Sequence, residues 1–170
     1  MENTEAKRNI KLIAFDLDGT DEASITRALV DCRRRLPEYE TYYRNFVPGC
    51  EKAALQLTAP VLGVRETRRI TGEYVLNVED FKRQAVFDDE IGRYAYPVDL
   101  HSPRPCRERK ADDSFQTLRY RNPGESYGIP FRCLLPRTLE NVLVAGRCVS
   151  TDRYMHGSLR VQPGCHITGQ

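Results

Sequence analysis

The feature that most constrains the fold is a short apolar segment that ends in glycine and arginine. Val142 to Ala145 is an uninterrupted apolar run, and Gly146 and Arg147 follow it. Such a run between polar residues is typical of a strand buried on both faces of a sheet. In open α/β sheets ligands bind beyond the carboxyl ends of strands, and a glycine there lets a ligand approach the backbone. The segment therefore predicts a buried strand followed by a binding position, where Arg147 offers a cation to a pyrophosphate or carboxylate.

The bulk properties favour an ordinary globular protein. The chain has 170 residues, of which 40% are hydrophobic and 29% are charged, enough for one domain with a real core. The net charge of +2 gives no strong case for nucleic acid or an anionic membrane as a partner. The polar N-terminus lacks a signal-peptide stretch, and no apolar run approaches the roughly 20 residues that span a bilayer. We therefore expect a soluble, cytoplasmic protein.

A helical pattern occupies the first third of the chain. Apolar residues recur at alternating steps of four and three, which places them on one face of a helix. They are Ile25, Leu29, Cys32, Leu36, Tyr39, Tyr43 and Phe46. Pro37 removes a backbone hydrogen bond inside this pattern and predicts a kink. Ser24 or Thr26 is expected to be the N-cap.

Extended structure is predicted for much of the remaining chain. The expected strands are Ile10 to Phe15, Leu55 to Thr58, Val61 to Ile70, Glu73 to Leu76, Tyr94 to Leu100 and Tyr127 to Leu135. Asn77 is expected to cap a short helix over Val78 to Phe81. The polar segment from His101 to Pro123 predicts a long loop. Pro163 and Gly164 predict the start of a C-terminal helix, with proline at its first position.

A charged cluster interrupts one of the expected strands. If Val61 to Ile70 is a strand, Glu66 and Arg68 share a face with apolar residues and need partners there. Arg65, Thr67 and Arg69 then face the other way. Two interpretations remain open: a cationic wall that orients an anionic or polar substrate, or a structural ion-pair network.

The cysteines and histidines suggest no metal site. The six cysteines are widely spaced and form no C-x-x-C pair, so zinc and iron–sulfur sites are not supported, and the thiols are expected to be buried or incidental. They are Cys32, Cys50, Cys106, Cys133, Cys148 and Cys165. His101 and His166 are expected to be structural or incidental, while His156 is also considered as a general base.

The segment from Lys11 to Thr20 resembles the opening motif of the haloacid dehalogenase superfamily, a strand followed by D-x-D-G-T. In that superfamily the first aspartate is a nucleophile, the second is a general acid and base, and Mg²⁺ screens the phosphate. The resemblance implies a phosphatase that uses Asp16 and Asp18, and it covers about ten residues. The structural alternative is a strand followed by an Asx-rich turn.

A second resemblance covers nearly the whole chain, from Asp18 to Gln170. Its ordered segments are Asp18–Asp21, Val47–Gly49, Gly63–Ile70, Gly72–Leu76, Glu79–Asp80, Tyr96–His101, Ile129–Pro136, Asn141–Cys148 and Ser158–Pro163. Together they resemble the C-terminal half of a family of FAD-dependent oxidoreductases, with relatives near heterodisulfide-reductase-type flavoproteins. Those relatives are associated with 4Fe–4S clusters, which the cysteine spacing here does not support.

This resemblance implies hydride transfer through FAD on an unidentified small molecule. The implied cofactor contacts are Gly146, Arg147, Arg160, Val161, Gln162 and Pro163. The C-terminal helix would direct its positive end at the flavin and stabilise the charge that reduction places near N1 and O2. Arg65, Glu66 and Arg68 are the candidate substrate residues, and no catalytic residue is identified.

The chain departs from the family at one motif. Members carry a strand–G-x-G-x-x-G–helix unit that holds the FAD pyrophosphate, and this sequence has none. We therefore expect an α+β, truncated flavoprotein: an N-terminal strand and turn (1–20), a helix plus mixed-β substrate-type domain (21–140), and a partial α/β FAD-binding element (141–170). A separate chain would then carry the pyrophosphate-binding half. A catalytically inert fragment is the remaining alternative.

Overall fold

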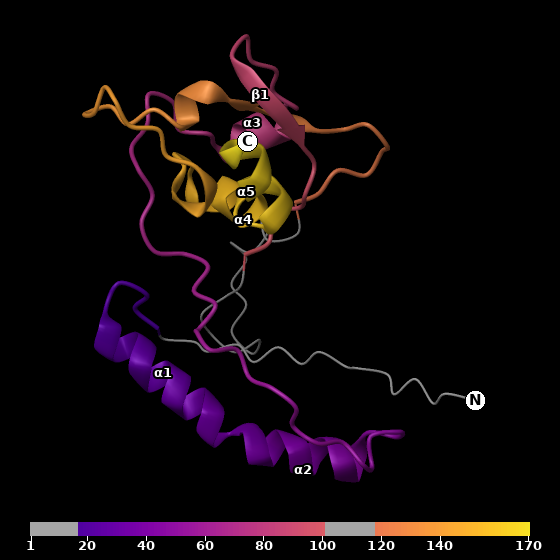
Figure 1. Ribbon diagram of the computed structural model, residues 1–170. Helices are drawn as coiled ribbons and strands as arrows, with labels where there is room; N and C mark the ends of the chain where they lie inside the picture. The colour runs from indigo at the N-terminus through magenta and orange to yellow at the C-terminus, as the bar shows by residue number, and fades with distance from the viewer. Residues whose placement is uncertain (1–16, 101–117) are drawn as a thin grey trace. The chain divides into compact units, whose positions relative to one another are not determined.

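The computed structural model describes residues 17–100 and 118–170. The chain divides into two compact units, Met1–Val64 and Arg65–Gln170 (Figure 1). The expected strand from Ile10 to Phe15, and most of the expected loop that begins at His101, lie outside the described residues.

The first unit contains two consecutive helices, α1 (Glu22–Arg34) and α2 (Leu36–Phe46). The sequence predicted one helix with a kink, whereas the structure interrupts it at Arg35. Pro37 lies in the first turn of α2. Backbone N–H groups there have no partner within the helix, so proline costs no hydrogen bond at this position. Neither helix has a buried residue, so within this unit both present their apolar side chains at least partly to solvent.

The N-cap of α1 is Asp21, so the expectation of Ser24 or Thr26 was wrong. The Asp21 carboxylate accepts hydrogen bonds from the backbone N–H groups of Ala23 (3.2 Å) and Ser24 (2.9 Å). The Ser24 hydroxyl instead accepts from the backbone N–H of Asp18 at 3.1 Å. Aspartate caps as well as serine does, and here it stands three residues earlier.

A small antiparallel sheet lies in the second unit. It pairs β1 (Glu90–Tyr94) with β2 (Tyr127–Pro130), and a bulge follows Glu90. The first strand therefore precedes the expected strand from Tyr94 to Leu100. The second stops before Leu135, because a 3₁₀ turn, η3 (Phe131–Cys133), follows Pro130.

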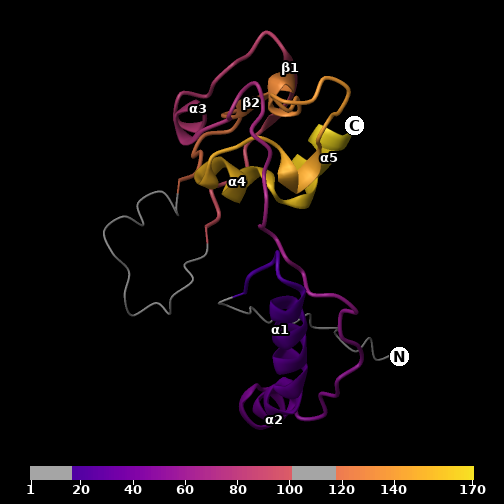
Figure 2. The same cartoon turned by 90° about the vertical axis from the view of Figure 1, so that its left-hand side faces the viewer.

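Three helices accompany this sheet. They are α3 (Val78–Lys82), α4 (Arg153–Leu159) and α5 (Gln162–Gly169). Asn77 caps α3 with a reciprocal bond to Asp80, so this prediction is confirmed. The C-terminal helix is also present, but it begins at Gln162, which places Pro163 second and not first. Figures 1 and 2 both show α4 and α5 side by side, and α5 also packs on β1.

The strands expected between Leu55 and Leu76 are absent from the described structure. Extended backbone after Ile70 makes only isolated bridges, from Gly72 to Pro136 and from Leu76 to Thr151. A bend at Thr67 interrupts the run before it. A β-like composition is not sufficient here, because a strand also needs a continuous neighbour to complete its ladder of hydrogen bonds.

The core of the second unit forms between the sheet and the helices. It contains Leu76, Phe81, Val98, Tyr127, Ile129, Cys133, Leu134, Val149, Met155 and Leu159. The buried Tyr127 hydroxyl lies 2.9 Å from the Ser158 hydroxyl, which in turn donates to the carbonyl of Tyr96. This chain of bonds satisfies the polar atoms that link β2 to α4.

Helices with one small antiparallel sheet confirm the α+β class. The mixed-β substrate domain and the partial FAD-binding element remain predictions. Among the described residues, no helix is long and apolar enough to cross a membrane. Cys32, Cys133, Cys148 and Cys165 form no disulfide among the described residues.

Gly164 should be essential for stability. A Cβ at this position would meet the backbone carbonyl of Leu159, which cannot move like a side chain. Gly164→Ala should therefore lower the free energy of unfolding by about 1–3 kcal/mol, measured by urea denaturation. Gly169→Ala is the matched control in the same helix, because a Cβ there meets nothing within 4 Å. Equal stabilities of the two variants would contradict this view of the packing.

Candidate functional site

A charged cluster forms around Glu66 in the second unit. Its carboxylate lies 2.9 Å from Nη1 of Arg69 and 3.3 Å from Nη1 of Arg160. Nδ1 of His156 lies 3.7 Å from Oε2 of the same carboxylate. We call Glu66, Arg69, His156 and Arg160 the Glu66 cluster.

Helix α4 supplies two members of this cluster. His156 lies within α4, and Arg160, its C-cap, follows one turn later on the same face. The Asp152 carboxylate caps the start of the helix by accepting from the backbone N–H of Met155 at 2.7 Å. Arg160 also donates from Nη2 to the carbonyl of Asp99 at 2.8 Å. Its side chain is only 6% exposed, so these bonds compensate a nearly buried charge.

Burial and charge act on the pKa values in the Glu66 cluster. Burial lowers the pKa of His156, although the charge of Glu66 opposes this effect. Burial tends to raise the pKa of Glu66, but the hydrogen bond from Arg69 and the surrounding positive charge bring it below its ordinary value. Near neutral pH we therefore expect an ionised Glu66 and a neutral His156.

His156 also contacts the glycine–arginine segment. Its Nε2 lies 3.1 Å from the carbonyl oxygen of Arg147, which belongs to a 3₁₀ turn, η4 (Gly146–Cys148). The imidazole of His156 therefore lies between the candidate substrate residue Glu66 and the backbone of the candidate cofactor residue Arg147. The sequence predicted each group separately and gave no reason to join them.

Gly146, the first residue of η4, has a left-handed backbone conformation and leaves space beside the turn. Gly146 has a φ of +77°, and a Cβ there would meet nothing within 4 Å. Its N–H donates to the Thr168 hydroxyl at 2.8 Å, which fastens η4 to the last turn of α5. The Arg147 side chain is exposed, as are Gln162 and Pro163 in the first turn of α5. The N-cap of α5 is Val161, whose side chain makes no capping hydrogen bond.

The expected strand before Gly146 is not formed. Val142 to Ala145 belongs to no strand, and among the described residues its backbone bond runs from the N–H of Val144 to the carbonyl of Leu134 at 3.0 Å. The side chains of Val142 and Leu143 are exposed. An apolar run becomes a buried strand only where neighbours cover both faces, and the described residues provide no such neighbours. The pairing expected with Ile10 to Phe15 lies outside the described residues.

A family model for FAD-dependent oxidoreductases matches the chain over residues 1–170. The chain belongs to this family. Searches among curated proteins and among solved structures found no significant match. The family match includes the D-x-D-G-T segment, so its aspartates fall within the flavoprotein pattern.

The described part of that segment forms a turn. The Asp18 carboxylate accepts from the Thr20 backbone N–H at 2.8 Å and from its hydroxyl at 2.7 Å. This is the Asx-type geometry that the structural alternative predicted, while Asp16 lies outside the described residues. Within residues 17–100 and 118–170, no three metal-ligating side chains of the His, Cys, Asp or Glu type converge.

Two of the three features that the family resemblance predicts for a flavin contact lie together in η4. A flavin needs close access to backbone, a cation for its anionic parts and a positive helix end near its reducible ring. Gly146 offers open backbone and Arg147 an exposed cation. Gly146 is bonded to Thr168 in the last turn of α5, at the other end of that helix from Gln162 and Pro163. Arg160 was expected among these contacts, but its described bonds are with Glu66 and Asp99.

The sequence missed Arg69 and Asp99. Strict alternation along a strand placed the side chains of Arg69 and Glu66 on different faces of the strand. The bend at Thr67 instead brings the two side chains together. Arg65 and Arg68 are exposed, and the charge of Arg65 contributes to lowering the pKa of Arg160, after burial. A spacing of three residues between Glu66 and Arg69 was the available signal, because it suits a turn and not a strand.

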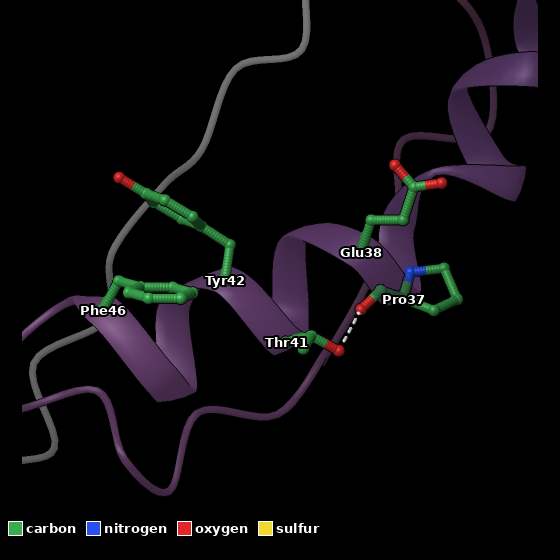
Figure 3. Close-up of a pocket in the computed structure, with 5 residues that line it drawn as sticks. All are labelled: Pro37, Glu38, Thr41, Tyr42 and Phe46. Atoms are coloured by element: carbon green, nitrogen blue, oxygen red, sulfur yellow. Dashed lines mark hydrogen bonds between the residues drawn. The ribbon is translucent and has the colours of Figure 1, made fainter.

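A separate shallow pocket lies on α2 (Figure 3). It is lined by Pro37, Glu38, Thr41, Tyr42 and Phe46. The Tyr42 and Phe46 rings lie beside each other with centroids 5.6 Å apart, and the Thr41 hydroxyl donates to the Pro37 carbonyl. This pocket contains no candidate cofactor or substrate residue, so the Glu66 cluster with η4 is the better candidate.

Removing the Arg160 side chain should destabilise the second unit. Arg160→Ala leaves the Glu66 carboxylate without one cation and the Asp99 carbonyl without a donor. We expect the free energy of unfolding to fall by about 1–3 kcal/mol, measured by urea denaturation. Arg68→Ala, at an exposed arginine of the same region, should change it by less than about 0.5 kcal/mol. A larger loss in Arg68→Ala than in Arg160→Ala would contradict this ranking.

Proposed function

We propose that this chain forms the substrate side of an FAD-dependent oxidoreductase that oxidises a small anionic molecule by hydride transfer. The observation that carries the proposal is the convergence at His156. One ring nitrogen faces Glu66 of the candidate substrate group, and the other contacts the carbonyl of Arg147 in the candidate cofactor group. Substrate and cofactor must be adjacent for hydride transfer, and this shared imidazole supports such an arrangement.

FAD, when bound, supplies the acceptor for the hydride. In this proposal Arg147 pairs with an anionic part of the cofactor, and the missing side chain at Gly146 allows close approach. The first turn of α5, with Gln162 and Pro163, favours negative charge through its helix dipole. Val161 positions that turn as its N-cap, and its carbonyl accepts from the N–H of Cys165 at 3.0 Å.

The charge balance of the cluster supports an anionic substrate. Arg69 and Arg160 contact the carboxylate of Glu66. The charges of Arg65 and Asp99 act on Arg160 in turn, so three arginines stand against two carboxylates. Because His156 is expected to be neutral, the group carries an excess of positive charge. Arg65 and Arg68 are the exposed cations that we propose contact the substrate, whereas Arg69 and Arg160 hold Glu66 in place.

A pyrophosphate-binding half is needed to complete this function. No G-x-G-x-x-G motif occurs in the 170 residues, and we propose that a separate polypeptide provides it. The exposed apolar side chains of Val142 and Leu143, next to Gly146, support an additional covering element at this edge.

The chain alone should bind FAD weakly. FAD fluorescence would be followed while the purified full chain is titrated, and the flavin retained after gel filtration would be measured. We expect retention well below one FAD per chain, because the glycine-rich pyrophosphate loop is absent. Arg147→Ala should weaken the residual binding by about threefold or more, since it removes a cation worth roughly 0.7 kcal/mol or more.

Arg153→Ala provides the matched control for that titration. Arg153 is an exposed arginine at the start of α4, and its loss should leave FAD binding unchanged. Stoichiometric retention by the chain alone would contradict the need for a second half. Equal binding by Arg147→Ala and the unsubstituted chain would contradict the cofactor position.

A further inference from the structure

The two ring nitrogens of His156 have different roles. Nε2 lies 3.1 Å from the Arg147 carbonyl oxygen, which can only accept a hydrogen bond. Nε2 must therefore carry the hydrogen. In the neutral imidazole this leaves Nδ1 as a lone-pair acceptor.

Nδ1 faces another acceptor. It is buried and has no hydrogen-bond partner among the described residues, and Oε2 of Glu66 lies 3.7 Å away. This distance is too long for a hydrogen bond, but it places the lone pair next to a carboxylate. Two acceptors this close repel each other. A proton on either Nδ1 or the Glu66 carboxylate turns that group into a donor and removes the repulsion.

The two groups differ in their access to solvent. The His156 side chain is 2% exposed, whereas that of Glu66 is 36% exposed. Glu66 is therefore the member of the pair that a bound molecule would meet first.

We propose that Glu66 and His156 form a proton-accepting pair for a substrate that carries a hydroxyl or amino group beside its anionic group. The inference rests on the proposed function and names its substrate class. The substrate O–H or N–H bond breaks as an O–H bond forms on Glu66. That bond then breaks as the proton moves to Nδ1, which leaves an imidazolium next to a carboxylate.

The surrounding charges set the sign of the pH dependence. Glu66 and Arg69 face His156 from the extended segment, and Arg160 faces it from the end of α4. The carboxylate raises the pKa of His156, while the arginines and burial lower it. Replacing Glu66 with glutamine should thus make His156 harder to protonate.

The test is ¹⁵N NMR of the full chain with labelled histidine, recorded across a pH titration, with His156→Gln to assign the signals. We expect the Nε2–H tautomer at neutral pH. Glu66→Gln should shift the His156 titration down by about 0.5–1 pKa unit, because a stabilising negative charge is lost. Glu79→Gln, the same chemical change at an exposed glutamate of α3 paired with Lys82, should cause no shift.

An Nδ1–H tautomer, or an unchanged titration in Glu66→Gln, would overturn the proton-accepting pair. Neither the tautomer nor the titration of His156 requires FAD or turnover to be measured. A failure of this test is therefore distinct from a failure of FAD binding. In the complete flavin-loaded enzyme, with a simple 2-hydroxy or 2-amino acid as the probe, His156→Gln should remove the acidic limb of the pH profile of kcat/KM. Its amide N–H can still donate to the Arg147 carbonyl, so a limb that persists would overturn the catalytic part of the proposal.

Discussion

The ion pair between Glu66 and Arg160 is the interaction on which the site depends. These residues are separated by 94 positions in the sequence, and Arg160 is almost fully buried. A buried guanidinium is tolerated only where acceptors surround it. Glu66 and the Asp99 carbonyl meet this requirement, and in doing so they attach the extended segment before Ile70 to the end of α4. His156, one turn earlier on α4, is thereby placed between Glu66 and η4.

A structural ion-pair network and a functional site are compatible in this arrangement. Arg69 and Arg160 have geometry suited to holding Glu66, and both are largely covered. Arg65 and Arg68 are exposed cations near the same cluster. Arg69 and Arg160 hold the carboxylate, and Arg65 and Arg68 are the cations that we propose contact a ligand. Because the chain belongs to the FAD-dependent oxidoreductase family, we propose a substrate of that family's chemistry as the ligand of Arg65 and Arg68.

Local signals predicted the helices better than the strands. The Asn77 cap of α3 and the proline in the first turn of α5 depend on residues within one turn, and the sequence contains them in full. The strands depended on partners elsewhere in the chain. Val142 to Ala145 has the composition of a buried strand, yet it remains exposed because no described neighbour covers it.

The sequence by itself determined the family, the Asn77 cap of α3 and the identity of the charged and glycine-containing segments. It could not determine that one imidazole joins Glu66 to Arg147, or that Arg69 and not Arg68 pairs with Glu66. Only the tertiary structure decided these contacts. The first physical reason is that a bend at Thr67 removes the alternation of side chains that a strand would have. The second is that the buried Arg160 needs acceptors, which come from distant parts of the chain.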